Sequence, residues 1–155
     1  MRQAIEDPRR FPFPPAIPII ALLLGWGMGR LWPIDVNWPA WSRWIGWVLF
    51  FTPPLLVVSA TRTFRRYQTA IDPLGKVTTI VASGPFRYTR NPMYLSLLVL
   101  YVGGTLAFRL PWAAVLLVPV FLALHFGVIL PEEQHLEATF GEPYRSYRQR
   151  VRRWL

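Results

Sequence analysis

Residues 84–100, GPFRYTRNPMYLSLLVL, change character in the middle of the stretch. The first half carries two arginines, Arg87 and Arg90, among residues that favour turns, and it ends at a proline. The second half is almost continuously apolar. This stretch therefore predicts a polar, arginine-bearing turn at the mouth of a membrane-like helix.

The composition supports a membrane setting for this helix. The chain has 155 residues, of which 53% are hydrophobic and eight are tryptophan, with a net charge of +9. This combination fits neither a soluble domain nor a disordered tail. Because Lys and Arg lie between apolar blocks, we expect them to face anionic headgroups and not nucleic acid. With no cysteine, disulfides, thiol nucleophiles and thiolate metal sites are excluded.

Four apolar blocks divide the chain. A membrane-spanning helix needs about 20 apolar residues, and two of the blocks meet this length. The other two are shorter, but flanking Trp and Arg side chains can extend a span by anchoring at the interface. A signal peptide would need a small-residue cleavage site after the first block, which is missing. We predict one all-α integral membrane domain over residues 1–155 with four transmembrane helices, at residues 16–31, 41–60, 93–108 and 112–130.

The distribution of charge between the blocks predicts the orientation. Three Lys or Arg residues precede the first block, six lie between the second and third, and five follow the fourth, against three near the opposite ends of the blocks, Arg30, Arg43 and Arg109. By the positive-inside rule, fourteen against three puts both termini and the long middle loop in the cytoplasm. In a bacterium, this membrane is the inner membrane.

Three features inside the spans have structural interpretations. Pro53 and Pro54 should kink the second helix. Gly25 and Gly29 form a small-xxx-small pair that should let two helices approach closely. His125 has two open interpretations: an ionisable residue at membrane depth is a functional candidate, but a neutral His bonded to a neighbouring helix satisfies the same constraint.

The polar residues concentrate in the loop 61–92 and in the tail 131–153. Pro131 suits a first helical position, and Glu132 and Glu133 would complement the dipole of the first turn. A helical apolar stripe follows, interrupted at Gly141 and Pro143. The tail is therefore expected to be a broken amphipathic helix on the cytoplasmic surface, with its arginines facing anionic lipid.

The expected topology brings the two polar regions together. A tight turn around residues 109–111 makes the third and fourth helices an antiparallel hairpin. The turn at the start of the third helix then lies opposite the acidic pair that follows the fourth, and forms a polar pocket at the lip of the bilayer. The alternative is a set of interfacial anchors with solvated charges. The residues brought together are Arg87, Arg90, Asn91, Glu132 and Glu133.

Two segments carry a family resemblance. TTIVASGPFRYTRNPMYL (78–95) followed by EEQHLEATFGEPYRSYRQRV (132–151) resembles the isoprenylcysteine carboxyl methyltransferase family and its phospholipid methyltransferase relatives. The resemblance covers about residues 64–151. The familiar motif of that family has His where this chain has Asn91. Asn can hydrogen-bond a cofactor but cannot act as a base near neutral pH.

The resemblance implies S-adenosylmethionine as the cofactor, held between the loop and the hairpin, with no metal. Arg87, Arg90 and Asn91 become the candidate catalytic residues. An arginine that eukaryotic relatives use for substrate falls near Val128 and is absent, so prenylcysteine does not follow as the substrate. The implied cofactor-binding residues are Thr78, Thr79, Ile80, Val81, Phe86, Asn91, Pro92, Met93, Tyr94, Glu132 and Glu133.

The side-chain chemistry agrees with this cofactor. Its ammonium group needs a carboxylate such as Glu132, and its carboxylate needs an arginine, Arg87 or Arg90. Its sulfonium suits an aromatic face, Phe86 or Tyr94. We therefore expect methyl transfer to a lipid-like or amphiphilic acceptor, either an isoprenylcysteine-like carboxylate or a phospholipid amine, at the cytoplasmic face. The alternatives are a sterol-reductase-like enzyme that binds NADPH, and a small transport or scaffold subunit without enzymatic activity.

Overall fold

The computed structural model describes residues 13–66 and 80–155, and these residues are almost entirely helical. A short 3₁₀ turn, Gly84–Arg87, precedes α4, and a π turn, His125–Ile129, follows α5. Within the described ranges the only extended pairing is an isolated bridge between Thr89 and Arg152. The predicted all-α class is confirmed. The α-helices are α1 Ala16–Leu31, α2 Ala40–Phe51, α3 Pro53–Arg66, α4 Pro92–Ala107, α5 Pro111–Leu124, α6 Leu130–Phe140 and α7 Glu142–Arg150.

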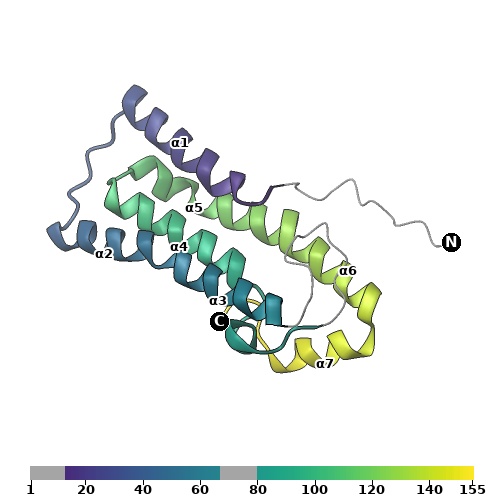
Figure 1. The fold of residues 1–155 in the computed structure, drawn as a ribbon. Helices are drawn as coiled ribbons and strands as arrows, with labels where there is room; N and C mark the ends of the chain where they lie inside the picture. The colour runs from purple at the N-terminus through teal and green to yellow at the C-terminus, as the bar shows by residue number, and fades with distance from the viewer. Residues whose placement is uncertain (1–12, 67–79) are drawn as a thin grey trace.

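The helices form an elongated bundle with α4 at its centre (Figure 1). On one side α4 packs against α2 and α3, and on the other side against α5, which α1 covers. The predicted hairpin of α4 and α5 is confirmed: three residues join the two helices, and Arg109 takes a positive φ of 53° there. The hydroxyl of the buried Tyr101 ties the hairpin together by donating to the Ala113 carbonyl at 2.7 Å.

Two of the helical segments are long and apolar enough to span a membrane. They are Ala40–Thr63 with 24 residues and Pro111–Phe140 with 30 residues, whereas α1 and α4 have 16 residues each. Large apolar side chains such as Leu23, Trp44 and Leu55 are exposed on the outside of the bundle. Such a surface is expected to contact lipid. The structure therefore supports membrane association, and four crossings stay a prediction.

At the proline pair, where a kink is expected, the helix is interrupted: α2 ends at Phe51 and α3 begins at Pro53. Neither proline has an N–H to donate to the preceding turn, and each ring crowds the carbonyl four residues earlier. Thr52 lies at the break, with its own N–H donating to the Val48 carbonyl at 3.0 Å.

The expectation that Pro131 starts a separate tail helix is wrong. The helix runs without a break from Pro111 to Phe140, and α5 passes into α6 through the π turn. There the N–H of Leu130 donates to the carbonyl of His125, five residues earlier. The wider turn lets a proline follow without the clash that a regular α-helix would produce.

The break in the tail lies where the sequence predicted it. Gly141 separates α6 from α7 and has φ +60°, a conformation that favours glycine. However, α7 ends at Arg150 and not at residue 153. The last residues are extended, because Arg152 pairs with Thr89.

Glycines set how closely the helices pack. A Cβ atom at Gly25 would lie 2.7 Å from the backbone nitrogen of Ala113, so the predicted close approach is confirmed for this residue. The contact between α2 and α4 is tighter still. A Cβ at Gly46 would lie 2.3 Å from the nitrogen of Ala107, and one at Gly103 would lie 2.4 Å from the nitrogen of Phe50.

Candidate functional site

The candidate site is built on the turn that precedes α4. Phe86 of the 3₁₀ turn is buried, and its carbonyl accepts a hydrogen bond from the hydroxyl of Tyr147 at 2.8 Å. The Phe86 side chain packs with Val81, Met93 and Ala60 of α3. Three of the predicted cofactor-binding residues therefore belong to one apolar cluster that fixes the turn against α3 and α7.

Asn91 and Pro92 are buried where the turn enters α4. The backbone N–H of Asn91 donates to the Thr89 hydroxyl at 3.1 Å, and its side-chain amide donates to the Arg153 carbonyl at 3.0 Å. The first bond fixes the backbone of Asn91, and the second ties its side chain to the C-terminal residues at the entrance to the helix.

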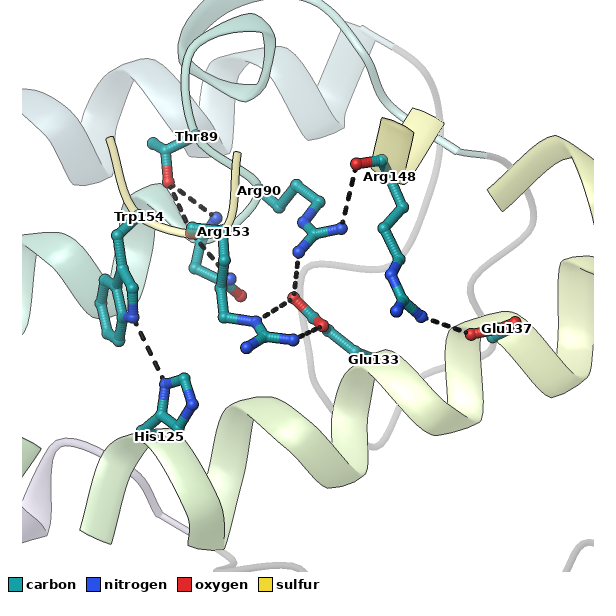
Figure 2. Close-up of polar contacts among 9 residues, drawn as sticks. Thr89, Arg90, His125, Glu133, Glu137, Arg148, Arg153 and Trp154 are labelled. Atoms are coloured by element: carbon teal, nitrogen blue, oxygen red, sulfur yellow. Dashed lines mark hydrogen bonds and ion pairs between the residues drawn. The ribbon is translucent and has the colours of Figure 1, made fainter. Parts of the chain in front are cut away.

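Glu133 lies opposite this turn and is the most heavily paired acid of the site. Its side chain is only 7% exposed. One oxygen lies 3.1 Å from Nη2 of Arg90, and the two oxygens accept from Nε and Nη2 of Arg153 at 3.0 and 2.8 Å (Figure 2). The prediction that Arg90 faces the acidic pair is confirmed.

Glu132, the neighbouring residue, has a different partner. It is half-buried and accepts a hydrogen bond from the hydroxyl of Tyr94 at 2.5 Å. Tyr94 lies in the first turn of α4, so this bond joins α4 to α6. The structure therefore brings two more predicted site residues together, in a position separate from the Glu133 ion pairs.

Other predicted residues lie outside this cluster. Arg87 is exposed, with its guanidinium carbon 5.0 Å from the ring centroid of Tyr88. Arg90, three residues later, pairs with Glu133 instead. Ile80 is half-buried. Thr78 and Thr79 lie outside the described residues.

The cluster has an excess of positive charge, with two guanidinium groups against one buried carboxylate. The hydrogen bond to Glu133 is the main reason that the pKa of Arg153 is raised. Burial, followed by the charge of Glu133, raises the pKa of Tyr144 to about 12. Both groups therefore keep their protons near neutral pH.

Arg90 has one unsatisfied donor in this cluster. Its side chain is 8% exposed, and its buried Nε has no hydrogen-bond partner among the described residues. A buried donor without a partner costs about 1 to 3 kcal/mol. The site therefore offers an unsatisfied donor at Arg90 and, at Glu132, a half-buried carboxylate.

Sequence reasoning missed Arg153 and Tyr147, which it placed on a lipid-facing tail. Arg153 turns inward to Glu133. The arginines of α7 also differ from the expectation, because Arg145 and Arg148 pair with Glu137 at 3.0 and 2.9 Å. Only the fold reveals these pairs, because α7 turns back at Gly141.

His125 is hydrogen-bonded, as one of its two interpretations required, but its partner lies in the C-terminal residues and not in a neighbouring helix. Its Nδ1 accepts a hydrogen bond from Nε1 of Trp154 at 3.3 Å. Its ring stacks on Phe121 and on Trp154, with centroids 5.6 and 6.2 Å away. The imidazole in the π turn therefore has a hydrogen-bond donor and two stacked aromatic rings.

Comparison with known families identifies the family of this chain. The profile of the family described as phospholipid methyltransferase matches residues 41–143, about two thirds of the sequence and most of the site. The chain belongs to the phospholipid methyltransferase family. The predicted relationship is confirmed, and membership in this family supports methyl transfer as the reaction.

Two curated proteins are similar to this family member. A protein of Haemophilus influenzae described as uncharacterized is 43% identical over 65 residues, which cover 41% of this chain and 100% of that protein. Methanethiol S-methyltransferase 1 of Bradyrhizobium diazoefficiens is 32% identical over 111 residues, which cover 68% of this chain but only 37% of that enzyme. No solved structure matches the chain.

Proposed function

We propose that this protein transfers a methyl group from S-adenosylmethionine to a lipid-like or amphiphilic acceptor at the cytoplasmic face of a bacterial inner membrane. The proposal includes four crossings, with α1 and α4 as short spans beside the two longer ones. Alternating positive charge supports this orientation, because it puts the candidate site on the cytoplasmic side.

The observation that carries the proposal is that the contacts between α6 and the segment leading into α4 include both a half-buried carboxylate, Glu132, and an arginine with an unsatisfied buried donor, Arg90. Glu132, oriented by Tyr94, would hold the ammonium group of the cofactor. Arg90, whose Nε is buried and unsatisfied, would hold its carboxylate, and this choice favours Arg90 over the exposed Arg87. S-adenosylmethionine supplies an electrophilic methyl group when it is bound.

The residues around these two charges would position the reactants. Tyr94 offers an aromatic ring near the place where a sulfonium would lie, and Asn91 offers a fixed polar side chain at the helix entrance. Neither is required to act as a base. Methyl transfer depends mainly on alignment of the acceptor with the methyl group and on exclusion of water, so a site assembled by fixed contacts suits it.

Replacing Glu132 with glutamine should weaken binding of S-adenosylhomocysteine by about 1.5 to 3 kcal/mol, the scale of a charge-assisted hydrogen bond. Gln can still accept the Tyr94 hydroxyl, so expression and membrane insertion should be nearly unchanged. Isothermal titration in detergent measures the affinity. Glu142→Gln is the control, because that side chain is 73% exposed and pairs only at 3.7 Å with Arg145. An affinity within about twofold of the parent would rule out this role of Glu132.

The acceptor is tested separately, in two arms. Purified protein is incubated with labelled S-adenosylmethionine and either a membrane lipid extract or methanethiol, the thiol in the name of the similar Bradyrhizobium enzyme. Label in a lipid product supports the proposal. Label in the thiol alone contradicts a lipid acceptor and indicates that the acceptor is a small sulfur compound. Binding of NADPH without S-adenosylhomocysteine would favour the reductase alternative, and binding of neither would favour a transport or scaffold role.

A further inference from the structure

The last residues of the chain return across the candidate site. Residues 151–154, which we call the C-terminal strap, run beside the turn that precedes α4. The N–H of Arg90 donates to the Arg152 carbonyl at 2.9 Å. The carbonyl of Arg153 accepts from the Thr89 hydroxyl and from the Asn91 amide, both at 3.0 Å.

The strap is also anchored at its far end, in the π turn. Trp154 donates to Nδ1 of His125 (Figure 2). Its ring also lies 5.3 Å from that of Phe121 in α5. The strap therefore connects the turn before α4, the acid of α6 and the π turn. The first two of these elements carry Arg90, Asn91 and Glu133 of the candidate site.

Arg153 competes with Arg90 for the same carboxylate. Arg153 donates to both oxygens of Glu133, at 3.0 and 2.8 Å, in a bidentate arrangement. Arg90 reaches only one of these oxygens, through Nη2 at 3.1 Å, and its Nε is left without a partner. Bidentate pairing is the preferred geometry of an arginine with a carboxylate. Arg90 would therefore adopt it if the second arginine were removed.

We propose that Arg153 is a positioning residue of the donor site: by occupying Glu133, it keeps Nε of Arg90 available for the carboxylate of the methyl donor. The inference rests on the proposed function. It gives the strap a role in ligand selection, because the effect concerns only ligands that carry this carboxylate. Removal of the Arg153 side chain leaves Glu133 paired with Arg90, so no buried charge is stranded and the fold should persist.

The test compares two ligands on one variant. Arg153→Ala should bind S-adenosylhomocysteine at least about tenfold more weakly than the parent, as for loss of a charge-assisted hydrogen bond. It should bind 5′-methylthioadenosine, which lacks the amino-acid end, with the parent's affinity. A role in folding alone would weaken both ligands equally.

The control is Arg152→Ala, because the Arg152 side chain is exposed and the residue bonds to Arg90 through its backbone carbonyl. This variant should bind both ligands as the parent does. Arg153→Lys keeps the charge but not the bidentate geometry, and should lie between the parent and Arg153→Ala. If Arg153→Ala does not fold, Arg153→Lys is tested in its place. The measured quantity is again the ratio of its affinities for S-adenosylhomocysteine and 5′-methylthioadenosine.

The outcomes separate the two proposals. A parent protein that does not bind S-adenosylhomocysteine contradicts the proposed function itself. A parent that binds it, combined with Arg153 variants whose affinities stay within about twofold or fall equally for both ligands, overturns the role of Arg153 alone.

Discussion

Replacing Glu133 with alanine is expected to lower the free energy of unfolding by about 3 to 5 kcal/mol, because it leaves buried charge without a partner. Glu133 and Arg90 are 7% and 8% exposed at their side chains, and Arg153 also relies on the same carboxylate. Alanine would remove the negative charge and strand two guanidinium groups. Thermal or denaturant unfolding in detergent, followed by circular dichroism, measures the loss.

The matched control lies one helical turn further along α6. Glu137 also pairs with two arginines, Arg145 and Arg148, but its side chain is 31% exposed and theirs are 57% and 50% exposed. Solvent screens such pairs, so Glu137→Ala should cost no more than about 1 kcal/mol. Equal losses for the two alanine variants would show that burial does not govern this ion-pair cluster.

Replacing Gly103 with alanine is expected to cost about 3 kcal/mol, at the upper end of the range for overpacking. The added Cβ would lie 2.4 Å from the backbone nitrogen of Phe50. A backbone atom in a helix cannot rotate away as a side chain can, so α2 and α4 would have to separate. The change is measured as the shift in the unfolding transition of the purified protein in detergent.

The neighbouring glycine distinguishes backbone contact from simple crowding. A Cβ at Gly104 would meet the flexible end of Leu22, at 3.2 Å, and one at Gly27 would meet nothing within 4 Å. Gly104→Ala should therefore cost less than Gly103→Ala, and Gly27→Ala should stay within about 1 kcal/mol of the parent. If the Gly103 and Gly104 variants lose equal stability, the close contact between α2 and α4 is not the reason that Gly103 does not tolerate a side chain.

The helix positions could be predicted because prolines and apolar runs mark them directly. Each predicted span agrees with an observed helix start within one residue, since Pro92 and Pro111 begin α4 and α5. The continuity of α5 and α6 could not be predicted. Pro131 has the same local signature whether it begins a helix or follows a π turn, and only the longer-range packing decides between them.

The pairs across the hairpin could be predicted from topology, whereas the partners of the individual arginines could not. The hairpin brings Arg90 to Glu133 and Tyr94 to Glu132. Arg87 and Arg90 look equivalent in sequence, but Arg87 is exposed whereas Arg90 pairs with the buried Glu133. The sequence predicts that Arg153 faces lipid, because basic tails beside a membrane usually contact anionic headgroups. In the fold, Gly141 reverses the chain and brings Arg153 to Glu133, 20 residues earlier.

The π turn has a consequence for how the length of this chain can vary. A regular α-helix turns by about 100° per residue, so one inserted or deleted residue in α5 would rotate Glu132 and Glu133 away from their partners. The π turn already contains one residue more than a regular turn. Loss of one residue within His125–Ile129, together with replacement of Pro131, would close the turn into ordinary α-helix and keep both acids in phase. Relatives that differ by one residue here can therefore preserve the same site.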